Sequence, residues 1–292
     1  MQRKFICFAF VCALLALGQI AHATPVPLSS VLDKYAVVSV GPMASMNQNS
    51  GPISGSVLVG IGSATSSSGG GGGAITGGVD NSGAPFATGD LFSKLNTPPT
   101  VTNVAASIGN QAILDAAALS GQASGLTPTV GPLGNISGAR TFTGNGGLNV
   151  IDIGNWSSPQ VTLVGGMDDF FIFNLTSFGT INTPMNIGGV LPSHILWNLT
   201  GTSGNIFQTS GGGIEYGTFL ATMGGDFQFS NLNLRGQLIN TDGNIQFVSG
   251  SMIPEFVPFA PPLATPEPAS LLTLGMALIG FGLVRKKIAE NK

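Results

Sequence analysis

The sequence has almost no cysteine or histidine. Both cysteines, Cys7 and Cys12, lie in the first apolar stretch, and only His194 lies beyond residue 23. The body can therefore form neither a disulfide nor a thiolate metal site. A single histidine gives no basis for a Ser-His-Asp triad. We expect a protein without catalytic residues, cofactor or bound metal, and not an enzyme.

Charge is scarce as well. Residues 24–265 hold four basic and eleven acidic side chains, a net charge of 4 − 11 = −7. So few Lys and Arg exclude nucleic acid as a partner, because phosphate contacts need cations. The negative balance repels anionic polymers and leaves a neutral polysaccharide or a solid surface open. The basic residues are Lys34, Lys94, Arg140 and Arg235; the acidic ones are Asp33, Asp80, Asp90, Asp115, Asp152, Asp168, Asp169, Glu215, Asp226, Asp242 and Glu255.

The N-terminus has the pattern of a secretory signal peptide. Arg3 and Lys4 precede an apolar stretch over residues 5–17, and Ala21 and Ala23 form a small-x-small cleavage site. The stretch is too short and too early for a structural span. We expect residues 1–23 to be removed on export.

The C-terminus has three parts in a fixed order. Pro266-Glu267-Pro268 is followed by an apolar run over 269–284 and the basic cluster Arg285-Lys286-Lys287. A helix over 269–284 would be roughly 24 Å long, just short of the ~30 Å hydrocarbon core. Basic residues behind such a run favour the cytoplasmic side. A plain tail anchor is the simpler alternative.

This tripartite end resembles the PEP-CTERM sorting signal of Gram-negative bacteria, which an exosortase recognises and cuts. The resemblance implies export through the inner membrane, a transient single-pass anchor over 269–284, and delivery to the cell surface or extracellular matrix. We expect the exosortase to be a processing partner and residues 266–292 to be the signal, preceded by a Pro-rich linker over 259–265.

Residues 24–258 are expected to be one extracellular domain that is mainly β. Apolar residues at three- and four-residue steps predict a single helix near 101–120, ended by Gly121 and Gly125. Short strand patterns separated by Gly, Asn or Ser fill 130–253.

A faint period of about twenty residues runs through this β region. Phe207, Phe227 and Phe247 are twenty apart, as are Leu199, Phe219 and Ile239, and two similar blocks at 217–221 and 236–240 are nineteen apart. This spacing favours a parallel β-helix with coils of about twenty residues and the helix packed alongside. A β-sandwich is the alternative.

The blocks at 168–174, 194–198, 217–221 and 236–239 resemble two secreted bacterial groups, the choice-of-anchor A surface proteins and the ice-binding-like adhesins. The second group implies a right-handed β-helix with one long helix alongside. Asn198 matches the first group better, whereas Thr222-Met223-Gly224-Gly225 departs from its usual sequence. The resemblance leaves the branch open.

Few residues stand out as ligand contacts. Asp168 and Asp169 follow two glycines and are expected to cap a turn, with a calcium contact as the alternative. Trp156 follows Gly154-Asn155 and is the candidate for an exposed ligand contact, because an indole can stack on a sugar ring. Trp197 lies in an apolar strand and is expected in the core.

These observations predict a non-enzymatic surface or matrix protein that serves adhesion or exopolysaccharide and biofilm structure. Ice binding is the first alternative. It requires a flat, regular row of small residues such as Thr, and the row Thr202, Thr222, Asp242 fails at its third position. An enzyme acting on polysaccharide is the second alternative, for which the carboxylates are too scattered.

Overall fold

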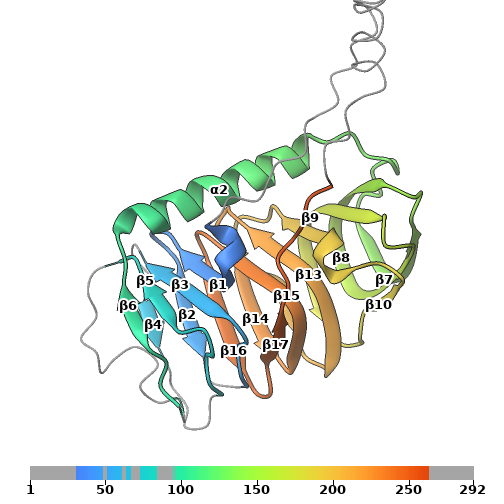
Figure 1. Ribbon diagram of the computed structural model, residues 1–292. Coiled ribbons are helices and arrows are strands. Elements are labelled where there is room, and N and C mark those ends of the chain that lie inside the picture. The colour runs from blue at the N-terminus through green and yellow to red at the C-terminus, as the bar shows by residue number, and fades with distance from the viewer. Residues whose placement is uncertain are drawn as a thin grey trace, which may run out of the picture. The chain divides into compact units, whose positions relative to one another are not determined.

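The structure is a computed structural model that describes residues 31–48, 51–60, 64–66, 73–83, 95 and 97–262, all within one compact unit, Val26–Pro262. Short strands dominate this part of the chain, with one long helix (Figure 1). The elements are η1 (Leu32–Lys34), β1 (Tyr35–Val40), β2 (Ser45–Gln48), β3 (Ser56–Gly60), β4 (Ala64–Ser66), β5 (Val79–Asn81), β6 (Val101–Asn103), α2 (Ala106–Gly125), β7 (Ile136–Thr143), β8 (Leu148–Val164), β9 (Phe170–Ile181), β10 (Asn186–Gly188), η2 (Pro192–His194), β11 (Ile195–Leu199), β12 (Asn205–Thr209), β13 (Gly213–Ala221), β14 (Asp226–Ser230), β15 (Leu232–Asn240), β16 (Asn244–Val248) and β17 (Met252–Phe256).

The strands form a parallel β-helix. Every pairing between the described strands is parallel, which excludes the antiparallel sandwich. The coils present three faces. The helix face carries β1, β3, β5, β6 and β11 with the aligned parts of β8, β9, β13 and β15. The second face carries β2, β4, β12, β14, β16 and the end of β9. The third carries β10, β17 and the first parts of β13 and β15.

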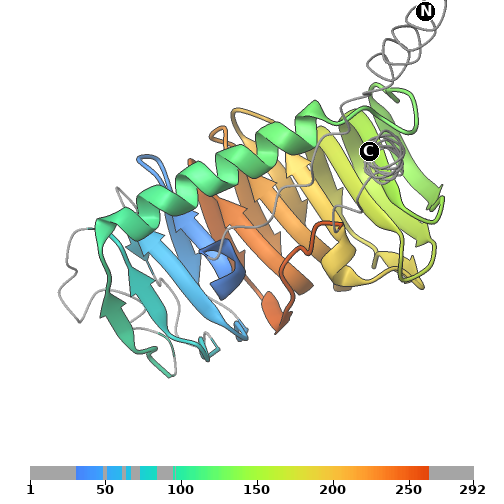
Figure 2. The same cartoon turned by 45° about the horizontal axis from the view of Figure 1, so that its top comes forward.

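The coils do not stack in the order of the sequence. Strand β1 pairs with β3 on one side and with β15 on the other, where Val37 lies opposite Leu238 and Ser39 opposite Asn240. The first and last coils of the chain therefore meet inside the stack, at a contact that we call the seam. Figure 2 shows the first strands lying directly beside the last ones.

Helix α2 makes this arrangement possible. It leaves β6 at one end of the stack and leads to β7 and β8 at the other, where Thr129 N donates to Val150 O at 2.9 Å. Its 20 residues span about 30 Å. The six strands β3, β1, β15, β13, β11 and β9 cover five steps of ~4.8 Å, about 24 Å. The helix is long enough to cross them all, and small buried residues such as Ala112 and Ala116 let it lie close to the sheet.

The predicted bounds of this helix were wrong. It runs from Ala106 to Gly125 instead of 101–120, because residues 101–103 form β6 and Val104 N still donates to Asn81 O at 2.9 Å. Gly121 does not end the helix. Its Cβ position is open, so a glycine there faces solvent and costs only about 1 kcal/mol relative to alanine.

Polar side chains fasten the end of the helix to the sheet. Asn198, fully buried, accepts from Ser120 Oγ at 2.7 Å and donates to Ser124 Oγ at 3.0 Å and to Asn174 Oδ1 at 2.8 Å. Asn174 in turn donates to Ala123 O at 2.9 Å and to Asp152 Oδ1 at 3.0 Å. Asn198, which helped to carry the family resemblance, thus has a structural role.

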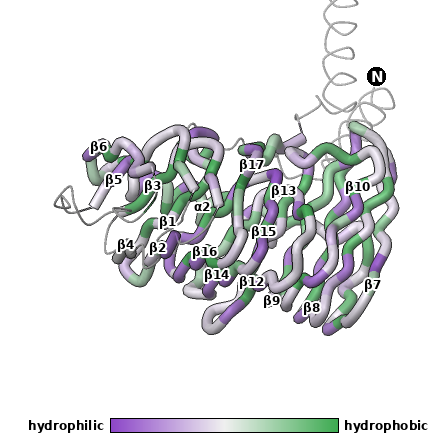
Figure 3. Tube along the Cα trace, turned by 90° about the horizontal axis from the view of Figure 1, so that it is seen from below, coloured by the Kyte–Doolittle hydropathy of each residue, from purple (hydrophilic) through white to green (hydrophobic). Residues whose placement is uncertain are grey.

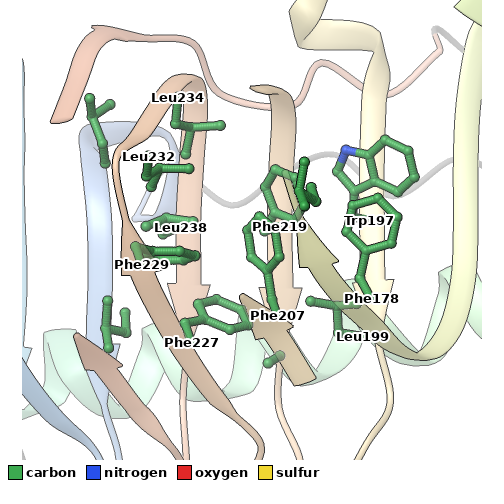
Figure 4. Packing of buried hydrophobic residues seen from close by; sticks show 14 of the residues in the cluster. Phe178, Trp197, Leu199, Phe207, Phe219, Phe227, Phe229, Leu232, Leu234 and Leu238 are labelled. Carbon is green, nitrogen blue, oxygen red and sulfur yellow. The ribbon is translucent and has the colours of Figure 1, made fainter. Parts of the chain in front are cut away.

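Aromatic side chains fill the interior of the coils (Figure 4). Trp197 stacks on Phe178 with ring centroids 4.8 Å apart, and Phe207 stacks on Phe219 at 4.1 Å. Such pairs contribute about 0.5–1.5 kcal/mol each beyond the burial of their area. The expectation that Trp197 is a core residue is confirmed.

The twenty-residue period is only an average. Phe207 lies opposite Phe227 as expected, but Phe247 lies opposite Phe229, and Phe219 lies opposite Trp197 and Leu238. The steps along the helix face are 24 residues from 171 to 195, 22 from 196 to 218 and 19 from 218 to 237. Corner turns of different lengths absorb the differences, and the nineteen-residue match of 217–221 with 236–240 is confirmed.

The seam can be tested at Gly41. This residue has φ +121°, and a Cβ there would lie 1.7 Å from the carbonyl oxygen of Thr241 in the last coil. We expect Gly41→Ala to lower the free energy of unfolding by about 3 kcal/mol, of which about 1 comes from the positive φ and the remainder from the clash. Urea unfolding of the full-length protein measures this change.

Gly204→Ala is the matched control, because Gly204 has φ +70° and open space around its Cβ position. It should show only the φ cost of about 1 kcal/mol. Equal losses in the two variants would contradict a closed seam at Gly41.

Candidate functional site

The second face presents a row of uncharged polar side chains. Asn47, Gln246, Gln228, Gln208 and Thr180 lie opposite one another on β2, β16, β14, β12 and β9. All five are partly exposed, while their strand neighbours, except Gly179, are buried. We call this row the amide face. Figure 3 shows hydrophilic positions along β2, β16 and β14.

Hydrogen bonds fix the orientation of Gln208 and Gln228 in this row. Gln228 Oε1 accepts from Gln208 Nε2 and from Asn205 Nδ2, both at 3.0 Å. Gln208 Oε1 accepts from Thr180 Oγ1 at 3.0 Å. Gln228 Nε2 has no acceptor among the described residues, so its two N–H groups remain for an external acceptor. Because Gln208 and Gln228 are already held in place, these two side chains lose less conformational entropy on binding.

A second polar row runs beside the amide face. Ser45 Oγ donates to Asn244 Oδ1, and Asn244 N donates to Asp226 Oδ1 at 2.8 Å. Asp226 lies opposite Asn205. Asp226 is the one charged side chain in the two rows, so the surface as a whole is a nearly neutral array of donors and acceptors.

Trp156 does not lie where the sequence analysis placed it. It belongs to the long strand β8, not to a turn, and is 0% exposed. Its Nε1 donates to Gly138 O at 2.9 Å, and its ring packs edge-on against Phe142 and Phe178. The prediction of an exposed ligand contact is wrong, because the strand continues through Gly154-Asn155 and turns the indole inward.

Asp169 organises a turn, as expected. Its Oδ1 accepts from Gly146 N at 2.7 Å, and its Oδ2 accepts from Gly166 N at 2.8 Å. Burial alone would raise its pKa, but these donors, with Asn149 Nδ2, lower the pKa below its usual value. Asp168 beside it is exposed. Within the described residues no three His, Cys, Asp or Glu side chains gather as a metal site would require.

His194 stacks on Phe170 with ring centroids 3.8 Å apart, and burial lowers its pKa. Its Nδ1 has no hydrogen-bond partner within the described part of the chain. The stacking on Phe170 gives His194 a structural role.

The sequence analysis missed an unusual side chain, Glu215. It is 0% exposed, lies opposite Leu234 inside the β-helix, and neither carboxyl oxygen has a partner among the described residues. Burial raises its pKa to about 8. The strand alternation around Gly213–Ala221 would have placed residue 215 inward, but acidic residues are rarely buried alone.

The signal-peptide residues Ala21 and Ala23, the sorting motif Pro266-Glu267-Pro268, the apolar run 269–284 and the basic cluster Arg285-Lys286-Lys287 lie outside the described residues. No helix in the described part of the chain is long and apolar enough to cross a membrane. The predicted bounds of the signal peptide and the linker stay predictions.

The comparisons with known proteins concern two parts of the chain, its C-terminal segment and its body. Residues 264–286 match the family model of the PEP-CTERM protein-sorting motif. No curated protein matches the sequence. An ice-binding protein from an Arctic yeast has a similar structure, with a TM-score of 0.51 and 15% identity over 84% of this chain and 98% of that one. An ice-binding protein from the Antarctic ascomycete Antarctomyces psychrotrophicus gives a TM-score of 0.51 and 14% identity over 78% and 98%.

The chain therefore carries the sorting motif that its sequence predicted, a motif that implies export and exosortase processing. Its body has the β-helix fold of these ice-binding proteins. At 14–15% identity the likeness shows the fold alone. The resemblance to choice-of-anchor A proteins stays a prediction.

The ionisation of Glu215 gives a pH prediction. Because its pKa rises from 4.5 to about 8 on folding, the native protein keeps a proton that the unfolded chain releases between these values. Its contribution to stability is fully present below about pH 4.5 and is lost as the pH rises toward 8, on the order of 5 kcal/mol in all.

Urea midpoints of the full-length protein at about pH 5 and pH 8 measure this loss. We expect Glu215→Gln to remove most of the pH dependence, whereas Glu255→Gln, whose side chain is 57% exposed, should leave it unchanged. The same slope in Glu215→Gln as in the natural protein would show that Glu215 is not the group that titrates.

Proposed function

We propose that this protein is an exported, non-enzymatic matrix or surface protein that binds a neutral polysaccharide through the amide face. The observation that carries the proposal is the in-register row Asn47, Gln246, Gln228, Gln208, Thr180 on a rigid scaffold. The row presents amide groups, including the unpaired Nε2 of Gln228, and amides can donate to and accept from sugar hydroxyls.

Two further features support this proposal. Residues 24–265 carry a net charge of −7, which disfavours an anionic polymer and leaves a neutral one. The sorting motif at 264–286 implies passage to the outside of the cell, where such polymers accumulate. The amide face runs across several coils, so it suits an extended chain better than a single small molecule.

Ice binding is the second candidate, favoured by the fold that this chain shares with ice-binding proteins. Binding to the ordered water of ice also requires a regular, flat row of side chains. The amide face contains one Thr among longer amides, however, and Thr202, Thr222 and Asp242 lie in the corner turns between strands, not on a face. The side chains therefore favour the polysaccharide.

The amide face can be tested with the double variant Gln228→Leu/Gln246→Leu. It removes two sets of donors and acceptors from partly exposed positions and leaves the core unchanged. At about 1 kcal/mol per lost hydrogen bond, retention on the producer's own neutral exopolysaccharide should fall at least tenfold. Co-sedimentation of the full-length protein measures the retention.

Gln160→Leu is the matched control, because Gln160 is exposed on β8 and lies away from the amide face. It should bind like the natural protein. Inhibition of ice recrystallisation by the natural protein, lost in the double variant, would favour the second candidate. Full retention of polysaccharide by the double variant would refute the role of the amide face.

The sorting motif supplies a separate test. We expect replacement of Pro266, Glu267 and Pro268 by alanine to leave the protein uncleaved in the inner membrane, because the exosortase no longer recognises its substrate. Immunoblots of membrane and extracellular fractions measure this. Pro261→Ala/Pro262→Ala, outside the matched segment 264–286, should be processed normally. Normal processing of the triple variant would contradict the assignment.

A further inference from the structure

A shallow groove lies at the corner between the amide face and the third face. Its volume is about 490 Å³, within the range of small-molecule sites. It crosses the turns that join β14 to β15 and β16 to β17, so it borders directly on the strands of the amide face. Its lining residues are Pro184, Gly212, Gly213, Ile214, Asn231, Asn233, Gly250 and Met252.

The floor of the groove is a short ladder. Ile214, Asn233 and Met252 lie opposite one another on β13, β15 and β17, about 4.8 Å apart from strand to strand. Glycines at the edge of the groove carry no side chains that could cover it. A Cβ at Gly212 would meet nothing within 4 Å, and Gly250 adopts φ +75° in its turn. The ladder is thus open along one side.

The chemistry of the floor is apolar with a single amide. Asn233 is partly exposed between Ile214 and Met252, but its Oδ1 is buried, so the amide presents its Nδ2 to the groove as a hydrogen-bond donor. No charged side chain lines the groove. Arg235 and Glu255, further along the same strands, pair with each other at 3.7 Å.

We infer that this groove holds one sugar unit of a neutral polysaccharide. The apolar face of the ring would rest on Ile214 and Met252, and a ring hydroxyl oxygen would accept from Asn233 Nδ2. The inference rests on the proposed function, because a polymer bound along the amide face would reach the groove at the corner between that face and the third face. It adds a specificity site with an apolar floor, which neither ice nor an anionic sugar would fit.

The test uses methyl NMR of the methionines in the full-length protein, kept in a detergent without sugar headgroups. Maltose- and cellulose-type oligosaccharides and fragments of the producer's own neutral polysaccharide are the probes. Oligomers of a uronic acid serve as the anionic comparison. We expect the Met252 methyl signal, assigned with Met252→Leu, to shift with at least one neutral probe and not with the anionic one.

Asn233→Leu should weaken the binding measured by this shift at least tenfold, because it removes the amide donor at nearly constant volume. Asn186→Leu is the control, since Asn186 is exposed on β10 outside the groove. An unshifted Met252 with all neutral probes, or equal losses in the two variants, would overturn the inference.

The two proposals can fail separately. If the double variant Gln228→Leu/Gln246→Leu loses the polysaccharide while Met252 stays silent, the amide face stands and the groove does not. If the natural protein is not retained by the polysaccharide at all, the proposed function fails first. A peptide or lipid probe that shifts Met252 while every sugar leaves it unchanged would also overturn the inference.

Discussion

The structure depends on the pairing between β1 and β15. Strand β1 comes from the first coil of the chain and β15 from one of the last, and their parallel register joins two separate stacks into one β-helix. Gln237 Nε2 strengthens the contact by donating to the carbonyl oxygens of Leu32 at 2.7 Å and Tyr35 at 2.8 Å. The amide face also crosses this boundary, because Asn47 belongs to the first stack and Gln246 to the second. Without the seam the row of amides would be cut in two.

Much of the architecture could be predicted from the sequence. The single helix, the mainly β body and the aromatic core follow from local patterns, and the nineteen-residue match of 217–221 with 236–240 gave the correct register for one pair of coils. The order of the coils could not be predicted. The contact of Val37 with Leu238 joins residues about two hundred positions apart, and no local pattern encodes it.

The candidate site was harder to predict for a related reason. Gln208, Gln228 and Gln246 are separated by twenty and eighteen residues, so only the register of the strands shows that they form a row. Trp156 was misplaced because Gly154-Asn155 resembles a turn, whereas the strand of β8 continues through it. Glu215 and Asn233 became visible as unpartnered groups only once their surroundings were known.

The scarcity of charge links the fold to the proposed role. Coils stacked about 4.8 Å apart bring like residues into rows, and rows of like charge would repel each other. Rows of Asn, Gln, Ser and Thr avoid this repulsion and hydrogen-bond along the stack, as Thr180, Gln208 and Gln228 do. The same uncharged rows give the second face its affinity for hydroxyl groups in our account.

The most direct test of this account is NMR of the side-chain amide groups of the full-length protein during titration with the producer's neutral exopolysaccharide. The account predicts that the amide signals of Gln208, Gln228 and Gln246 shift together, while that of Gln111 on the exposed side of α2 stays unchanged. Shifts confined to other parts of the molecule, or no shift where the polysaccharide is bound, would contradict it.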